Sequence, residues 1–571
     1  MRARHGLPSR GPVRAIALAV LAVGLLAGAA RGTTITIINL DGANEGLNDT
    51  THVAPVGGNP ETRLGDQRLF VLRYAADVWE SVLPSTVEIR VQAAFNALNC
   101  TATTGTLGSA GPIDAVRNFP GAPLGPNYLY HVALANRLAG SDQVPSRNDI
   151  NTQLNSSIGL TGCLEGTSWY YGVDNNPGTN QFDLLGTVLH ELAHGLGFST
   201  TTNGSTGSYS GGFPHVYDHF LYDNALGLHW DQMTSSQRAA SANACDRLVW
   251  DGAYVIQHAP GALGDKPILR VNTPPAIDGD YEVGTAAFGP PLTSSPLTQD
   301  IVLVNDGTGT TTDGCEALIN GGAVSGKLAL IDRGNCPFVQ KVANAQNAGA
   351  IGVIIADNVA GCPPAGLGGI DPTITIPSVR VTLADGNTLK ANLPGVNATL
   401  TRDPALIAGA DAAGRPKLYT PSTFAGGSSV SHWDTSADPD LLMEPFLTPI
   451  GPDLVDLTRW HFADIGWFDG LTAVRESATG ETRLMSSAPN PFARSTTIRT
   501  AIKTEAEVEL SIYDLVGRRV AVLHRGVLPA GNHAFEWRGL DDSGHLLPPG
   551  IYLSRVRVGG VSEAARLVMR R

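Results

Sequence analysis

The segment from 181 to 197, QFDLLGTVLHELAHGLG, constrains the fold of this chain more than any other. Its apolar residues recur at helical spacing and form one stripe of Leu185, Val188, Leu189 and Leu192. Asn180 can cap the helix, and Asp183 falls in the first turn, where a negative charge suits the helix dipole. Gly195 and Gly197 end it. We therefore predict a helix with one buried face.

This helix carries the HExxH pattern as His190-Glu191-Leu192-Ala193-His194. Residues four apart share a helix face, so both imidazoles can bind one ion. A catalytic Zn²⁺ takes three protein ligands and keeps one position for water, whose pKa it lowers towards about 7. Glu191 can take a proton from that water and pass it to a leaving amine. The motif predicts hydrolysis of a peptide bond, with His190 and His194 as zinc ligands and Glu191 as general base.

The third ligand does not follow from the motif alone. No Glu occurs between Glu191 and Glu282, which disfavours the class of zinc peptidases that takes a Glu from a following helix. The compact pattern HExxHxxGxxH has its glycine at Gly197, but Thr200 occupies the third His position. The nearest other candidates are His215, Asp218 and His219. Ordinary polar side chains are the simpler interpretation of these three.

Four blocks of sequence together resemble the leishmanolysin-like metzincins. They are HELAHGLGF (190–198), SHW (431–433), LLMEP (441–445) and LTRWHFADIGW (457–467). In that family a long insertion separates HExxHxxGF from the third histidine, although here the insertion is larger than in leishmanolysin itself. The resemblance implies that His432 is the third zinc ligand and that Met443 forms an apolar floor below the metal. His461 we interpret as structural.

The insertion between the two halves of this domain changes character from about 255 to 405. GKLALIDRGNCPFVQKVANAQNAGAIGVIIADN predicts a strand at Leu328–Ile331, a helix from Pro337 to Ala348 and a strand at Ile351–Ile355. Residues 313–358 resemble the protease-associated (PA) domain of secreted peptidases and some receptors. That resemblance implies a role in substrate access or protein binding rather than in catalysis. Asp332 and Arg333 we expect to pair with each other at a strand end.

Residues 471–571 read as an all-β module. VELSIYDLVG alternates, with Val508, Leu510 and Ile512 on one face. APNPF (488–492), IYDLVGRRV (512–520) and PPGIYLSRV (548–556) resemble the Ig-like domains of flagellar hook-capping proteins and type IX secretion sorting tails. The resemblance implies sorting or cell-surface attachment, and a plain spacer sandwich stays open as the alternative.

The first 31 residues have the features of a signal peptide. Arg2, Arg4, Arg10 and Arg14 precede the apolar run from Ala15 to Ala30, and Ala27-Gly28-Ala29 offers a cleavage site. A membrane anchor is the alternative, but the run is short of the span of about 20 residues. Removing residues 1–30 takes away four arginines and no acid, so the net charge goes from −13 to −17. An acidic mature chain without a basic stripe argues against nucleic acid or anionic membrane as a partner.

Six cysteines in an exported chain favour disulfides, and none has the CxxC spacing of a structural zinc site. Keeping each bond within one predicted domain gives Cys100–Cys163 and Cys315–Cys336. Cys245 and Cys362 are then left over, as a pair that links two domains.

The chain is long enough, at 571 residues, for about three to five domains. Residues 61–83 predict a helix with a stripe of Leu69, Leu72, Ala76 and Trp79, and VEIRVQAAF a strand with Val87, Ile89 and Val91 on one face. We predict an α+β metzincin-like catalytic domain made of 32–254 and 406–470, an α/β PA domain at 255–405 and a β-sandwich at 471–571. The predicted function is a secreted or cell-surface zinc endopeptidase acting on proteins or peptides. An inactive adhesion or binding protein on a peptidase scaffold is the alternative, which the intact Glu191 disfavours.

Overall fold

The computed structural model describes residues 33–447 and 454–468, and in the C-terminal part 483–488, 495–502, 506–514, 518–529, 531–548, 550–558 and 561–569. The predicted signal peptide lies outside these ranges. Contacts divide the chain into two compact units, Met1–Ala473 and Val474–Arg571. Within the described ranges, none of the helices combines the length and the apolar character that crossing a membrane requires.

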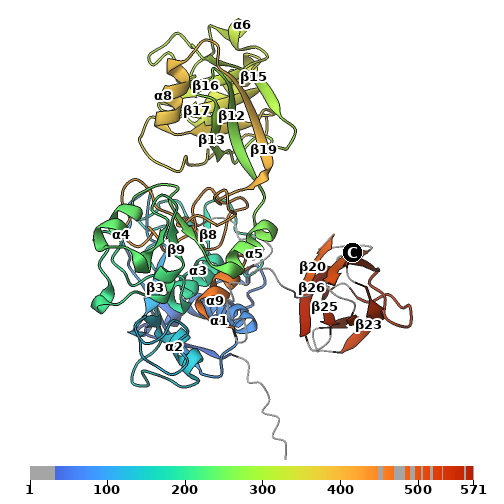
Figure 1. Ribbon diagram of the computed structural model, residues 1–571. Helices are drawn as coiled ribbons and strands as arrows, with labels where there is room; N and C mark the ends of the chain where they lie inside the picture. The colour runs from blue at the N-terminus through green and yellow to red at the C-terminus, as the bar shows by residue number, and fades with distance from the viewer. Residues whose placement is uncertain are drawn as a thin grey trace, which may run out of the picture. The chain divides into compact units, whose positions relative to one another are not determined.

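The first unit opens with a four-stranded sheet in the order β1-β2-β6-β3, of which Figure 1 labels β3. β1 (Ile35–Asn39), β2 (Ile89–Asn96) and β6 (Ile150–Asn155) are parallel, and β3 (Gly108–Pro112) runs antiparallel to β6. Ile89 and Val91 of β2 are buried, as the alternation predicts. Because β3 is last in the order, it forms one edge of this sheet.

Helix α1 (Leu64–Val82) lies within the predicted range 61–83. Leu72 and Trp79 are buried, but Leu69 is 38% exposed, so its assignment to the buried stripe was wrong. The apolar face of α1 is centred near Leu72 and Trp79, and Leu69 lies at its edge. Residues at the edge of such a face are partly exposed to solvent.

Helix α3 (Leu184–Leu196) carries the HELAH motif and begins three residues later than predicted. Its N-cap is Asp183, whose carboxylate accepts the backbone N–H groups of Leu185 and Gly186 at 3.2 and 3.3 Å. Asn180 is not the cap, because Gln181–Asp183 forms the short strand β8. At the other end Gly197 is the C-cap with φ 139°, and a Cβ there would approach Ile465 Cδ1 to 2.5 Å.

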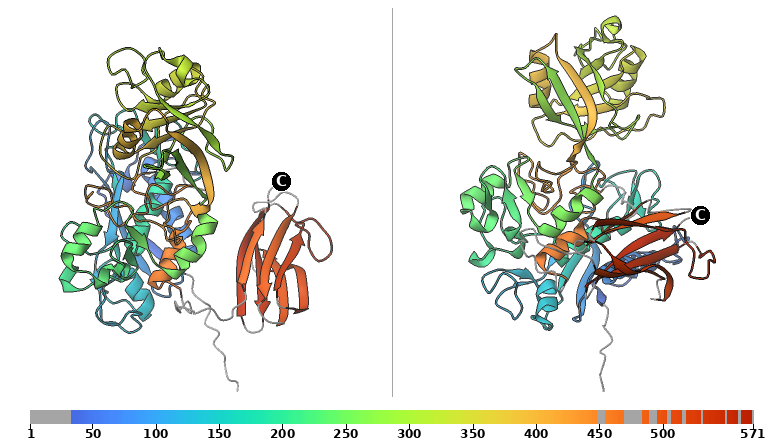
Figure 2. Two further views of the ribbon diagram at one scale, coloured as in Figure 1. Left: turned by 45° about the horizontal axis from the view of Figure 1, so that its top comes forward. Right: turned by 45° about the vertical axis from the view of Figure 1, so that its right-hand side comes forward.

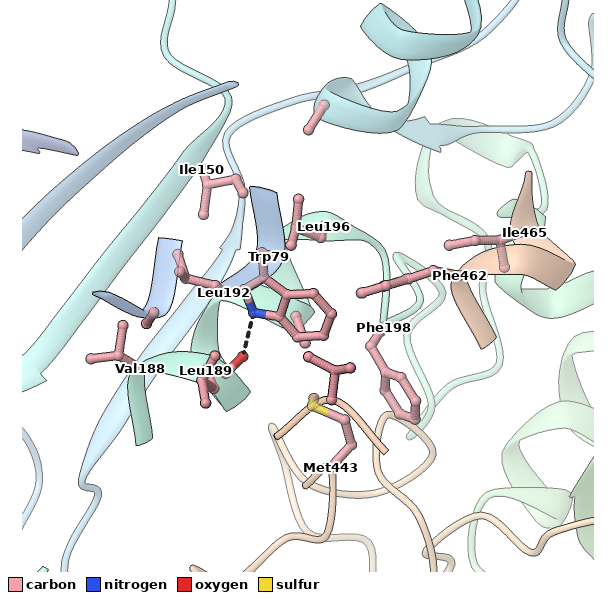
Figure 3. Close-up of a cluster of buried hydrophobic side chains, with 14 of the residues drawn as sticks. Trp79, Ile150, Val188, Leu189, Leu192, Leu196, Phe198, Met443, Phe462 and Ile465 are labelled. Atoms are coloured by element: carbon pink, nitrogen blue, oxygen red, sulfur yellow. Dashed lines mark hydrogen bonds between the residues drawn. The ribbon is translucent and has the colours of Figure 1, made fainter. Parts of the chain in front are cut away.

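A hydrophobic core around α3 joins distant parts of the chain (Figure 3). Trp79 of α1 donates its indole N–H to the carbonyl of Leu189 at 3.2 Å and meets the ring of Phe462 with 5.2 Å between centroids. Phe462 belongs to α9 (Thr458–Ile465), so the last helix of the unit packs beside the first one. The core therefore holds together segments separated by almost four hundred residues.

Short elements connect α3 to the insertion. They are the 3-10 turns Ser210–Gly212, Val216–His219 and Trp230–Gln232, β9 (Leu221–Asp223), β10 (Leu228–His229), α4 (Ser235–Ser241), β11 (Leu248–Trp250) and α5 (Ala253–Ala262). Before α3 come the 3-10 turn Gly46–Asn48, β4 (Ala115–Val116), β5 (Tyr130–His131), α2 (Val132–Ala139) and β7 (Ser168–Tyr170). Val255 and Ala259 of α5 belong to the core around α3. Helix α5 therefore packs with the segments that surround α3.

The insertion forms an eight-stranded sheet in the order β13-β12-β19-β15-β16-β17-β18-β14. Its strands are β12 (Asp265–Thr273), β13 (Gly279–Glu282), β14 (Gly284–Thr285), β15 (Leu297–Leu303), β16 (Leu328–Asp332), β17 (Gly352–Ala356), β18 (Ser378–Val381) and β19 (Asn397–Ile407), with α6 (Gly321–Val324), α7 (Phe338–Asn347) and α8 (Leu383–Ala391). β16, α7 and β17 are the predicted strand, helix and strand. β12 and β19 run side by side (Figure 2). They connect the insertion to the parts of the first unit that precede and follow it.

Asp332 and Arg333 do not pair with each other. The carboxylate of Asp332 contacts Lys390 Nζ at 2.8 Å, and Arg333 Nη1 contacts Asp357 Oδ1 at 2.8 Å. Consecutive side chains of a strand point to opposite faces, so neighbours in sequence meet different partners. The expected pair is wrong, although both residues do form ion pairs.

Three disulfides join the pairs expected from the sequence. Their Cα–Cα distances are 5.0 Å for Cys100–Cys163, 5.9 Å for Cys245–Cys362 and 5.8 Å for Cys315–Cys336. Cys245–Cys362 connects the segment before the insertion to the insertion itself.

The second unit contains two antiparallel sheets, β20-β21-β24 and β23-β22-β25-β26. The strands are β20 (Arg483–Ala488), β21 (Thr496–Ile502), β22 (Ala506–Asp514), β23 (Arg519–Leu528), β24 (Gly531–Trp537), β25 (Gly550–Val558) and β26 (Val561–Met569). Val508, Leu510 and Ile512 are fully buried and share one core with Ile498 and Trp537 of the other sheet. The alternating pattern is thus a strand of a two-sheet module.

Candidate metal centre

Helix α3 and one distant loop contribute the three histidines of the site. His190 and His194 lie one turn apart on α3, and His432 lies in the irregular segment that follows β19. The loop is held on both sides, because Tyr419 N–H donates to the carbonyl of His432 at 2.9 Å and Trp433 N–H donates to the carbonyl of Met443 at 2.9 Å. Backbone hydrogen bonds within the segment 419–443 therefore hold the loop around His432.

The three Nε2 atoms form a compact triangle. They are 3.1 Å apart between His190 and His194, 3.1 Å between His190 and His432, and 3.2 Å between His194 and His432. Zinc–nitrogen bonds of about 2.0–2.1 Å in a tetrahedral arrangement separate two ligand nitrogens by about 3.3 Å. The triangle has the size that one such ion requires, and the three residues form a group able to hold a metal.

The other ring nitrogen of each histidine is bound to a backbone carbonyl. The Nδ1 atoms meet the carbonyls of Leu442 at 2.7 Å, Phe198 at 2.8 Å and Ser428 at 2.8 Å, for His190, His194 and His432 respectively. A carbonyl only accepts, so each Nδ1 carries the proton and each Nε2 presents a lone pair. Three lone pairs that face one another call for a cation between them.

Burial keeps these rings neutral. It lowers the pKa of His190 to about 4 and that of His194 to about 3, with His190 adding to the effect on His194. Burial, followed by the two neighbouring histidines, holds the pKa of His432 well below its usual value. Neutral imidazole is the form that binds a metal ion.

Glu191 is buried beside the triad and against the edge strand β3. Burial raises its pKa to about 8, and a hydrogen bond with the backbone of Ala110 acts in the opposite direction. A Cβ at Gly108 would come within 2.7 Å of Glu191 Oε1, so only glycine leaves room for this carboxylate. β3 and Glu191 therefore pack directly on each other.

Met443 lies in the apolar cluster next to the ligands. It is fully buried and lies beside Leu189 and Phe198 in Figure 3. The preceding carbonyl, that of Leu442, holds His190. The burial of this side chain is compatible with the apolar floor that the resemblance implies, and that role stays a prediction.

The alternative ligands lie elsewhere and have other partners. Asp218 accepts the hydroxyls of Thr200 and Thr202 at 2.6 and 2.5 Å, and His219 Nδ1 meets Asp231 Oδ2 at 2.6 Å. His215 caps a 3-10 turn. Thr200 stands at the position where the compact pattern has a histidine. Its hydroxyl donates a hydrogen bond to Asp218 of the neighbouring loop. His461 packs between Phe198 and Trp250 at 4.3 and 4.2 Å between centroids, away from the triad.

A second cluster of acidic residues lies in the insertion and contains its own cation. Asp306, Asp313 and Glu316 bring carboxylate oxygens within 4.8 Å of one another. Lys341 is fully buried beside them, and its Nζ donates to the carbonyl of Asp313. The lysine supplies the positive charge that these carboxylates require.

A cleft of about 1030 Å³ opens over the triad. Residues 105–110, which include the start of β3, and the segments 426–428 and 440–447 line it together with α3. The sequence did not identify the strand beside the metal. β3 reads GSAGP, and two glycines and a proline give no alternating pattern. The glycine at position 108 is explained only by the tertiary structure, which places Glu191 next to it.

Comparisons with protein families identify three parts of the chain. The PA domain matches residues 297–389, and the FlgD Ig-like domain matches residues 493–559. A family described as SPBPB7E8-like matches residues 128–242, a range that includes HELAH. The chain is therefore a multidomain protein of mixed α and β structure, with a PA domain and a C-terminal Ig-like domain.

Relatives match over short segments. The human ER degradation-enhancing alpha-mannosidase-like protein 3 is 44% identical over 75 residues, which are 13% of this chain and 8% of that protein. Leucine aminopeptidase 2 of Arthroderma otae is 32% identical over 122 residues, which are 21% of this chain and 23% of that protein. The chain thus spans less than a quarter of these relatives. A solved aminopeptidase from Aneurinibacillus sp. strain AM-1 is 23% identical, covers 33% of this chain and 42% of its own, and has a TM-score of 0.20.

Proposed function

We propose that this protein is an exported, zinc-dependent endopeptidase of the metzincin type. The convergence of three Nε2 lone pairs within 3.2 Å, beside a buried carboxylate in an open cleft, carries the proposal. His190, His194 and His432 would hold the zinc. Peptidases among the relatives agree with this reaction class, but the matched segments are about a fifth of the chain or less.

The positions of the side chains suggest separate roles for the bound zinc and for Glu191 in peptide hydrolysis. Zinc bound by the triad supplies a Lewis acid that polarises the scissile carbonyl and lowers the pKa of water. Glu191 accepts a proton from the attacking water and delivers it to the nitrogen of the leaving amine.

The edge strand supports an extended polypeptide as the substrate. β3 borders the cleft, and an edge strand offers backbone N–H and C=O groups to an added strand. Such pairing aligns residues on both sides of the reacting bond and does not require a free terminus. This arrangement favours internal cleavage over removal of N-terminal residues.

The ends of the chain complete the proposal. The signal sequence at 1–31 would direct export, and the Ig-like domain would serve in sorting or attachment to the cell surface. Fractionation of expressing cells, comparing the full chain with a chain ended at 473, tests this part. Equal distribution of the two between surface and medium would contradict it.

Glu191→Gln is the decisive variant for the enzyme. We expect purified wild-type protein to contain zinc and to cleave casein, and Glu191→Gln to keep the zinc while kcat falls by about 10²- to 10⁴-fold. Metal analysis by mass spectrometry and a fluorescent casein assay measure both quantities. Glu316→Gln, an exposed carboxylate of the insertion, is the matched control.

Two further outcomes separate the alternatives. Zinc without any cleavage in the wild type would indicate the inactive binding protein, and equal activity in Glu191→Gln would indicate a contaminant. Peptides with an acetylated N-terminus distinguish the two peptidase types, because an aminopeptidase does not cleave them and an endopeptidase does.

A further inference from the structure

The ionisable side chains along the cleft, other than histidines, are all carboxyl groups. Apart from the three histidines, the ionisable side chains that line it are Glu191, Asp440 and Glu444, and no lysine or arginine is found among the lining residues that the structure describes. Glu191 is assigned to proton transfer. The other two carboxylates belong to the segment 440–447, which forms one wall of the cleft, here called the acidic wall.

Glu444 is a buried carboxylate that faces this cleft. It is 3% exposed, and its Oε1 accepts the backbone N–H of Leu441 at 2.9 Å, which fixes its orientation. Burial raises its pKa to about 9, and the neighbouring Asp440 adds to this effect. The site thus combines a defined direction with a burial that favours the neutral acid, and a cation that enters beside it would favour the ionised form.

Two other carboxylates with little exposure, Glu282 and Asp357, have cations beside them. Glu282 contacts Lys417 Nζ at 2.7 Å, and Asp357 contacts Arg333 Nη1 at 2.8 Å. Neither Glu444 nor Asp440 forms an ion pair with a lysine or arginine within the described ranges. A cation stabilises a buried carboxylate more than it stabilises an exposed carboxylate. Glu444 is therefore suited to pair with a positive charge that enters the cleft.

The acidic wall is adjacent to the metal ligands. The carbonyl of Leu442 accepts from His190 Nδ1, and that of Met443 accepts from Trp433, which follows His432. Two residues span at most about 7 Å of chain, so Glu444 lies within that reach of Leu442. A substrate side chain that meets Glu444 therefore belongs to a residue next to the cleaved bond.

Apolar side chains flank the carboxylates on the same wall. Leu441 is buried there, Phe446 is 64% exposed and Leu447 is 36% exposed. Lysine and arginine have long apolar stems that pack on such surfaces while their charged tips reach a polar partner. The wall matches both parts of these side chains.

We propose that Glu444, assisted by Asp440 at the mouth, forms the subsite that selects a lysine or arginine side chain next to the cleaved bond. The proposal rests on the endopeptidase function proposed above. The positive tip takes the place of the missing cation at Glu444, and the apolar rim holds the stem. An acidic side chain at the same position meets repulsion from both carboxylates.

Matched peptides test the selection. A blocked ten-residue peptide is varied at each position around the cleaved bond with lysine, arginine, norleucine or glutamate, and kcat/KM is measured for each. We expect one position at which lysine or arginine exceeds norleucine by about 10- to 100-fold, as a charge-assisted contact provides, and glutamate is poorest. In Glu444→Gln this ratio of basic peptide to norleucine peptide falls to about one.

Two controls keep the test decisive. Glu444→Gln must retain zinc at the wild-type level, and Asp440→Lys provides a second variant at an exposed position, where the ratio should fall about threefold to tenfold. Glu316→Gln should leave the ratio as it is. Cleavage by the wild type with no preference for basic residues, or an unchanged ratio in both variants, overturns the subsite and leaves the peptidase intact. Absence of cleavage by zinc-loaded wild type overturns both proposals.

Discussion

Two groups of three histidines lie in the first unit, and they differ in what orients their rings. The metal triad comprises His190, His194 and His432. The second group, here called the aromatic histidine group, comprises His131, His215 and His461, which are all fully buried. Ring centroids are about as close in both, at 4.7 to 5.0 Å in the triad and 4.5 Å between His131 and His215.

Hydrogen bonds explain the difference. Every Nδ1 of the triad is bound to a backbone carbonyl, which turns each Nε2 to the same point. Neither ring nitrogen of His461 has a hydrogen-bond partner among the described residues, and its ring packs on Phe198 and Trp250 as an aromatic side chain would. Proximity and burial do not make a metal site. The carbonyls that fix the tautomer and the direction of each ring are what distinguish the triad from the aromatic histidine group.

The largest expected effect separates the two groups directly. His432→Ala removes one of three converging ligands, and we expect the purified protein to lose its zinc and its cleavage activity together. Metal analysis after dialysis measures this. His219→Ala, which alters a histidine bound to Asp231, should keep both zinc and activity. Loss of zinc in His219→Ala with retention in His432→Ala would move the site to the 215–219 segment.

An intermediate effect is expected from the apolar floor of the triad. Met443 is fully buried, and truncation of such a side chain leaves a cavity that costs about 2–5 kcal/mol of unfolding free energy. Met443→Ala should therefore lower stability in urea unfolding while the protein still binds zinc, because all three ligands remain. Met443→Leu, which conserves most of the volume, is the control and should cost less than about 1.5 kcal/mol. If Met443→Ala unfolded at the same urea concentration as the wild type, the side chain of Met443 would not be packed in the core.

The smallest effect concerns the aromatic histidine group and depends on pH. Burial holds the pKa of His461 well below 6.5, so the folded protein keeps this ring neutral where the unfolded chain binds a proton. Stability from this residue is complete above about pH 6.5 and is lost as the pH falls below it. His461→Phe should make the acid side of the stability curve shallower by up to about 1.4 kcal/mol per pH unit.

Unfolding in urea between pH 5 and pH 8, with chelator present for both proteins, measures the difference. At pH 8 His461→Phe should be more stable by about 1 kcal/mol, because two buried nitrogens without partners are removed. A lower stability at pH 8, or an unchanged acid slope, would mean that the ring nitrogens have a partner in solution.

Much of the fold was predictable wherever neighbours in sequence decide the structure. The stripe of Leu185, Val188, Leu189 and Leu192 predicts α3 because a helix repeats every three to four residues. The spacing of His190 and His194 places both rings on one face for the same reason. The strand, helix and strand of the insertion and the alternating strand at 508–512 follow from equally local periods.

Features that depend on a distant contact were missed or misassigned. The start of α3 was placed too early because Asp183, and not Asn180, supplies the capping oxygens. Leu69 faces solvent because the sheet covers a narrower arc of α1 than the apolar pattern suggests. Asp332 and Arg333 meet Lys390 and Asp357 instead of each other.

The sequence by itself predicted two of the proposed ligands and the proposed general base, since one turn of helix arranges all three. It did not determine which distant side chain completes the triad; family resemblance pointed to His432, and the tertiary structure brings its Nε2 to 3.2 Å from that of His194, which is 238 residues away along the chain. Tertiary structure alone placed the edge strand against Glu191 and the carboxyl of Glu444 in the cleft wall. Such placements depend on carbonyls and packing surfaces that are far apart along the chain, and no local period encodes them.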